Sequence, residues 1–192
     1  MRTALVLLAA TMAGSPLAAQ GGGHRDCGVQ SGARLENAGV GAIRIGATLD
    51  QLESQCEVVR DTVVYPDDTH AEHVIGFKVD KDMIEVIADS GNRVTEIRVT
   101  SYRWKTVEGL GVDTELAKFL EIPGLLGIPG SEQELTVFLQ VPQYCGLDFR
   151  LPWYGASANP PDSVTVQFLK TLPPKSTVTS VIVHACFPKP GS

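Results

Sequence analysis

The chain has 192 residues, of which 43% are hydrophobic, and a formal net charge of −6 at pH 7. This apolar content is enough for one sizeable domain or two small domains that share a core, and it excludes disorder for most of the chain. An acidic surface repels phosphate groups, so nucleic acid and anionic membrane surfaces are excluded as main partners.

The first 19 residues have the pattern of a secretory signal peptide. Arg2 precedes an apolar stretch over residues 5–13, and the helix-breaking residues 14–16 follow before Ala19. Export machinery and signal peptidase recognise this order of charge, short apolar core and small residues. We therefore expect cleavage after Ala19, a leader over residues 20–39, and an exported protein, periplasmic or extracellular, with no membrane span.

Four cysteines follow the expected cleavage site, and an even number in an exported protein predicts disulfides. They are Cys27, Cys56, Cys145 and Cys186. Three pairings are possible, and we expect Cys27–Cys56 and Cys145–Cys186 because each link then stays within one half of the chain. A zinc site is the alternative interpretation, but the sequence has no C-x-x-C pair and its histidines lack zinc-finger spacing.

A first folded unit is expected over residues 40–105. Apolar residues alternate at 43–45 as in a strand, and those of 49–56 recur at helical spacing on one face. Thr48, followed three residues later by Gln51, is typical of a capping box at a helix start. Segments rich in Val and Ile, separated by turn-forming Asp, Gly and Asn, then predict four strands at 58–65, 74–79, 83–88 and 93–101.

The apolar pattern around the first helix returns after a shift of 67 residues, which indicates an internal repeat. Leu110, Val112, Leu116 and Phe119 stand where Ile43, Ile45, Leu49 and Leu52 stand in the first copy. Either Asp113 or Thr114 is expected to cap the second helix.

A second unit is therefore expected over residues 106–192. Its predicted strands are 135–140, 147–151, 163–169 and 178–185, and its predicted loops, rich in Pro and Gly, are 122–131, 152–162 and 171–175. Together the two halves predict an α+β protein of two tandem helix-plus-antiparallel-sheet units, packed together and stapled by disulfides. One continuous sheet with two helices on one face is the alternative.

The residues 43–52, with the sequence I-R-I-G-A-T-L-D-Q-L, resemble a known family signature. They are similar to the I-x-x-G-M-T-x-x-x-V motif that opens the small envelope domains of beta-lactamase-inhibitory proteins and SmpA/OmlA-type outer-membrane assembly lipoproteins. Ala47 stands where the family usually has Met, and Asp113 replaces the Gly in the second copy. Two tandem copies, each with a disulfide, look most like the inhibitory proteins, in which a concave sheet face with exposed aromatics grips a partner protein.

The resemblance implies a protein-binding surface, and the sequence offers five candidate residues for it. Side chains of Trp, Tyr and Arg suit this role because they bury much area while losing little rotamer freedom. The alternative is that these aromatic residues cover the edge of the core. The predicted function is an exported non-catalytic binding module, inhibitor-like or assembly-like. The candidates are Tyr102, Arg103, Trp104, Trp153 and Tyr154.

One expected hairpin loop gathers carboxylates and imidazoles, the ligand types of a divalent metal site. It contains Asp67, Asp68, His70, Glu72 and His73. Their spacing matches no known ion-binding loop. His70 and His73 are three residues apart, so their side chains would converge on a helix but not on a strand. We expect a solvated acidic loop and no cofactor. The alternative function, a small-ligand or metal-binding protein or an enzyme, places its chemistry here or at Pro152 to Asp162.

No catalytic motif is present in the sequence. It has no G-x-S-x-G elbow, no S-x-x-K and no H-E-x-x-H, and the cysteines are expected to be paired. His184 is the remaining candidate base, but it stands between Val183 and Ala185 in an expected strand, so we expect a core or sheet-face histidine. The sequence therefore predicts that the protein is not an enzyme.

Overall fold

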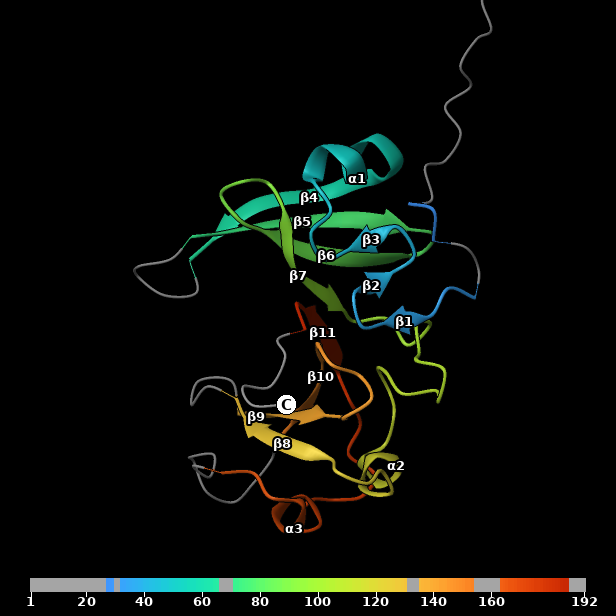
Figure 1. Cartoon of the computed structure of the whole chain (residues 1–192), viewed down its shortest axis with the longest axis vertical. Coiled ribbons are helices and arrows are strands. Elements are labelled where there is room, and N and C mark those ends of the chain that lie inside the picture. Colours follow the sequence, from blue (N-terminus) through green and yellow to red (C-terminus); the bar gives the residue numbers. More distant parts are fainter. Residues whose placement is uncertain (1–26, 30–31, 66–70, 131–134, 154–162, 187–192) are drawn as a thin grey trace, which may run out of the picture.

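The computed structural model describes residues 27–29, 32–65, 71–130, 135–153 and 163–186, so the expected signal peptide lies outside the described residues. Its main element is an antiparallel eight-stranded sheet (Figure 1). In sheet order the strands are β4 (Glu57–Val64), β5 (Glu72–Val79), β6 (Asp82–Ala88), β7 (Val94–Val99), β11 (Ser180–His184), β10 (Leu147–Pro152), β9 (Thr136–Gln140) and β8 (Leu126–Pro129).

The two halves of the chain meet inside this sheet. Each half contributes four strands to the large sheet. The last strands of the two halves, β7 and β11, pair antiparallel, with Val99 opposite Val181 and Ile97 opposite Val183. The expectation of two tandem units with separate sheets was therefore wrong, and the fold is mostly β. The physical reason is that each four-stranded set leaves an edge of unpaired N–H and C=O groups, and pairing the two edges satisfies both.

Within the described residues, three helices and a small sheet accompany the large one, and Figure 1 shows α1 at one end and α2 and α3 at the other. The first helix begins with the expected capping box: the Thr48 side chain accepts from the Gln51 N–H, and the Gln51 side chain accepts from the Thr48 N–H. The elements are β1 (Leu35–Glu36), β2 (Gly39–Val40), β3 (Ile43–Arg44), α1 (Leu49–Gln55), α2 (Leu116–Leu120) and α3 (Val166–Leu169).

The backbone before the two main helices has the same geometry in both halves. The Gly46 N–H donates to the Val94 carbonyl at 2.7 Å, and the Asp113 N–H donates to the Val178 carbonyl at 2.8 Å. Both donor residues have positive φ, 81° for Gly46 and 64° for Asp113. The second copy thus keeps a left-handed turn although its residue is not glycine, which Asp tolerates better than most side chains.

The cap of α2 differs from the prediction. Its N-cap is Glu115, whose side chain makes no capping hydrogen bond. Asp113 is excluded as the cap because an N-cap residue takes an extended backbone, not a left-handed one. The Thr114 hydroxyl instead accepts from the Gly111 N–H at 3.0 Å, inside the preceding loop.

Two predictions in the second half were wrong. The segment 163–169 was expected to be a strand, but the Thr165 hydroxyl accepts from the Phe168 N–H and caps α3, which buries Leu169. The segment 126–129 was expected to be a loop because of its Gly and Pro, but it forms β8 at the sheet edge. An edge strand tolerates both residue types, and Gly127 leaves room for the close approach of Val164.

The core lies between one face of the large sheet and the helices. On this covered face Ile75, Phe77, Val86 and other alternate strand residues are buried with Leu52 of α1 and Leu116 of α2. Both expected disulfides, Cys27–Cys56 and Cys145–Cys186, are confirmed, and they are compatible with an exported protein. No helix within the described residues is long and apolar enough to cross a bilayer.

Candidate functional site

The two tryptophans expected at a partner surface lie in the core. Trp104 is 3% exposed and Trp153 is 5% exposed, and the Trp153 ring packs edge-on against Phe168 with ring centroids 5.8 Å apart. These contacts match the alternative interpretation, in which the aromatics cover the edge of the core. An alanine substitution at either position would therefore change the stability of the fold and would not probe recognition of a partner.

The other candidate residues for a partner surface differ in their exposure and contacts. Tyr102 is 64% exposed and remains available for contact. Arg103 donates through Nη1 to Asp80 at 2.7 Å and to Asp82 at 3.2 Å, so it ties the chain after β7 to the β5–β6 turn. Both hydrogen bonds raise the pKa of Arg103. Tyr154 lies outside the described residues.

The candidate metal ligands do not converge where they are described. Glu72 and His73 are neighbours in β5, so their side chains point to opposite faces of the sheet. Glu72 pairs with Arg98, and His73 Nε2 lies 2.8 Å from an Asp61 carboxylate oxygen. No group of three or more metal-ligating side chains occurs among the described residues. The other candidates, Asp67, Asp68 and His70, lie outside the described residues.

A set of polar side chains lies on the face of the large sheet opposite the core, which we call the open face. On the central strands these residues alternate with buried ones, as Glu96 and Arg98 do with Ile97 and Val99, and most of the set are only partly exposed. They follow one another across the sheet from β4 to β9, and we call them the polar row. The row consists of Arg60, Glu72, Glu85, Glu96, Arg98, His184, Asp148 and Gln140.

Arg98 of β7 organises the first part of the polar row. Its Nε donates to Glu96 at 2.6 Å, and its Nη2 donates to Glu72 of β5 at 3.3 Å. Burial lowers the pKa of Arg98, but the nearby Glu96, Glu72 and Glu85 outweigh it, and the net change is upward. The guanidinium is therefore permanently charged, and it is held in place by one carboxylate of its own strand and one of β5, on the far side of β6.

Arg60 extends this cluster to the edge strand β4. It forms an ion pair with Glu85 of β6, across the intervening strand β5. The residue between them on the open face is Gly76, and a Cβ there would lie 2.9 Å from Arg60 Cβ and 2.6 Å from Met83 Sδ. The missing side chain thus lets Arg60 cross β5, which explains a glycine in the middle of a long strand.

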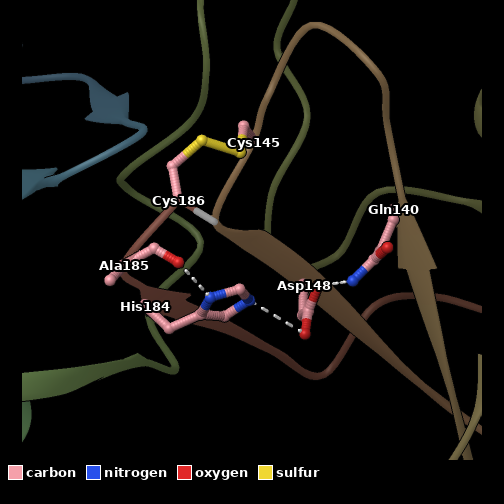
Figure 2. Close-up of a disulfide and its surroundings, with 6 residues drawn as sticks. All are labelled: Gln140, Cys145, Asp148, His184, Ala185 and Cys186. Atoms are coloured by element: carbon pink, nitrogen blue, oxygen red, sulfur yellow. Dashed lines mark hydrogen bonds and ion pairs between the residues drawn. A yellow bond between two sulfur atoms is a disulfide. The ribbon is translucent and has the colours of Figure 1, made fainter. Parts of the chain in front are cut away.

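His184, Asp148 and Gln140 form the second part of the polar row on three adjacent strands (Figure 2). The Gln140 amide donates to Asp148 Oδ1 at 2.7 Å, and His184 Nε2 lies 3.2 Å from Asp148 Oδ2. His184 Nδ1 lies 2.9 Å from its neighbour's carbonyl, that of Ala185. Both ring nitrogens thus lie within hydrogen-bond distance of protein oxygens, which hold the imidazole in place on the sheet face.

An open groove lies where the small sheet meets the turn between β9 and β10. Its volume is about 490 Å³. Arg44 on one wall donates to Glu36 at 2.7 Å, while Arg34 is exposed. The groove is lined by Arg34, Leu35, Glu36, Asn37, Ala38, Arg44, Val107, Gln143 and Tyr144.

Sequence reasoning did not identify the polar row or the groove. A signal for the row was present, because Glu85, Glu96 and Arg98 alternate with Val86, Ile97 and Val99 as on a sheet with one polar face. The groove had no such signal, since its walls come from residues 34–44, 107 and 143–144, which only the tertiary structure brings together.

Comparison with known proteins supports the fold and gives no function. No family model matches the sequence, and no curated protein matches it. The chain is similar in structure to the uncharacterized protein yfeY from Escherichia coli, with a TM-score of 0.58 and 10% sequence identity. The match covers 79% of this chain and 99% of that chain, so the two proteins share a fold over most of their lengths.

Proposed function

We propose that the protein is an exported, non-catalytic binding protein that recognises a protein partner through the open face of its sheet. One observation carries the proposal. The helices and the small sheet pack on the covered face, while the open face presents a polar row that continues across the junction of the two halves. An antiparallel sheet that packs its core on one face commonly leaves the other face for solvent or a partner.

The geometry of the polar row suits recognition. Arg98 and Asp148 are each held by two neighbouring side chains, so they lose little conformational freedom when a partner binds. The charges of the row, two arginines among four acidic residues, favour a partner with a complementary pattern and disfavour others. The row therefore provides specificity, while partly exposed apolar residues such as Ile182, opposite Arg98, provide contact area.

Affinity capture from an envelope extract tests the proposal. The bait is the protein from Gln20 onward, compared with a variant in which Arg60→Ala and Arg98→Ala remove two cations from the open face. We expect the variant to retain its fold, because such partly exposed ion pairs contribute about 0–1 kcal/mol each. Its capture of the partner should fall at least about tenfold, as expected for loss of an arginine contact of about 1.4 kcal/mol.

The matched control is Lys81→Ala with Arg93→Ala, which removes the same charge outside the polar row. Lys81 lies in the β5–β6 turn, and Arg93 donates to the Gly46 carbonyl near the start of α1. The control bait should capture as much partner as the unaltered protein. Equal losses with both variants, or no partner on any bait, would contradict the proposal.

A second candidate function, binding of a small anionic ligand, is favoured by the groove. Arg34 and Arg44 place two guanidinium groups in it, against one carboxylate from Glu36, although the chain as a whole is acidic. Guanidinium groups bind carboxylates with charge-assisted hydrogen bonds, and Tyr144 with Val107 offers an apolar wall. This chemistry suits an organic acid with an apolar body.

Benzoate is a suitable probe for the groove. In an NMR titration we expect saturable shifts of the Asn37 and Tyr144 amides, with a Kd on the order of 1 mM, or about −4 kcal/mol. The shifts should disappear in Arg34→Gln with Arg44→Gln and persist in Arg93→Gln. Shifts that never saturate, or that survive the double substitution, would exclude an anion site in the groove.

A further inference from the structure

The two disulfides differ in their access to solvent. Cys27 is 0% exposed and Cys56 is 3% exposed, and both belong to the hydrophobic core. Cys145 is only partly buried, and Cys186 is exposed. Exchange requires a thiolate to reach a sulfur of the disulfide, so access separates an inert bond from a reactive one.

The position of the exposed disulfide makes its opening a local event. β10 and β11 pair from Leu147 opposite Val183, and the His184 N–H donates to the Gly146 carbonyl at 2.9 Å. Cys145 and Cys186 lie just beyond this last hydrogen bond (Figure 2). Breaking the bond between them removes none of these hydrogen bonds, so we expect the reduced form to keep its strand pairing and to remain folded, with a lower free energy of unfolding.

We propose that Cys145–Cys186 is a thiol–disulfide exchange site of the folded protein, whereas Cys27–Cys56 is purely structural. The inference is independent of the proposed partner surface. Its co-reactant is an external thiol, either a small-molecule thiol such as glutathione or the dithiol of an oxidoreductase.

We expect the exchange to begin at the more exposed cysteine, Cys186. The external thiolate attacks Cys186 Sγ, a new S–S bond forms there, and the Cys145–Cys186 bond breaks. Cys145 leaves as a thiolate and takes a proton from water. A second external thiolate then attacks the mixed disulfide and releases Cys186, so the protein disulfide gains two electrons and the two external thiols are oxidised to a disulfide.

Opening this bond frees the turn that forms one wall of the groove. Gln143 and Tyr144 of that wall directly precede Cys145, and a Cβ on Gly146 would lie 3.2 Å from the Asn37 carbonyl of the opposite wall. The turn is packed against the small sheet on one side and clamped by the disulfide on the other. Exchange removes the clamp and widens the range of positions available to Tyr144.

Stepwise reduction of the intact protein tests the site. The protein is exposed to increasing reduced glutathione without denaturant, free thiols are alkylated, and the labelled cysteines are identified by mass spectrometry. We expect Cys145 and Cys186 to be labelled at least about tenfold faster than Cys27 and Cys56, with unchanged circular dichroism. Simultaneous labelling of all four cysteines, or earlier labelling of Cys27 and Cys56, would overturn the proposal.

A trapping experiment tests the point of attack. In Cys145→Ser, the remaining Cys186 should form a mixed disulfide with oxidised glutathione while the protein stays folded. Its matched control, Cys186→Ser, leaves the less exposed Cys145 and should react several times more slowly. If Cys145 reacts as fast as Cys186, or neither reacts until the protein unfolds, attack at Cys186 is excluded.

Discussion

Replacing Phe149 with alanine is expected to lower the free energy of unfolding by about 3–5 kcal/mol, the cost of removing a buried aromatic ring and leaving a cavity. Phe149 is fully buried in β10, opposite Leu139 and Val181, and its ring packs edge-on against Phe119 of α2 with centroids 5.0 Å apart. It therefore joins a helix to the middle of the sheet. Urea denaturation followed by circular dichroism measures the loss.

Phe138→Ala is the matched control on the neighbouring strand. Phe138 lies on the open face, opposite Arg150, and is only partly buried. Its removal creates no enclosed cavity, so we expect a loss of about 1 kcal/mol. Equal losses for the two phenylalanines would mean that the open face is packed like the core, contrary to the fold described above.

Removing the buried disulfide is the second large effect that we expect. The Cys27–Cys56 link closes a chain segment with a sequence separation of 29, which corresponds to about 3.5 kcal/mol in the chain-entropy account. The double substitution Cys27→Ala with Cys56→Ala also removes two buried sulfur atoms from the core, which lowers the free energy of unfolding by about 2 kcal/mol more. A total of about 5.5 kcal/mol reaches the lower end of the stability of an ordinary domain. Thermal unfolding of the variant should show a strongly lowered Tm.

Cys145→Ala with Cys186→Ala provides the comparison. The sequence separation of 41 predicts that removing this disulfide lowers the free energy of unfolding by about 4 kcal/mol through chain entropy. No further loss from core packing is expected, because these two cysteines lie outside the core. The variant should therefore be more stable than the one lacking Cys27 and Cys56. The reverse order would show that the exposed disulfide, and not the buried one, holds the fold together.

Local features of the fold were predictable because they depend on residues close in sequence. The capping box of Thr48 and Gln51 lies within one helical turn, and the Val- and Ile-rich segments 74–79 and 83–88 are bounded by turn residues that mark two strands. Segment 163–169 was ambiguous because its local sequence pattern fits both a strand and a helix. Its Val164, Val166 and Phe168 alternate as in a strand, and the cap at Thr165 decides for a helix.

The candidate site was less predictable because its parts are distant in sequence. His184 was correctly expected on the sheet, but its partner Asp148 is 36 residues away and had no motif to mark it. Tyr102 is exposed and Arg103 forms ion pairs with Asp80 and Asp82, whereas Trp104 and Trp153 are buried. Composition identifies aromatic residues that suit an interface, but it does not distinguish them from those that cover a core.

The sequence alone indicated that the four cysteines form disulfides, and it indicated most of the strands and the first helix. These follow from the even number of cysteines in an exported chain, from local hydrogen-bonding groups and from the two-residue period of a strand. Only the tertiary structure decided that β7 pairs with β11, which turns two halves into one sheet and aligns the polar row across it. Alternation specifies which side chains point inward but not which strand lies alongside, because every strand edge offers the same N–H and C=O groups.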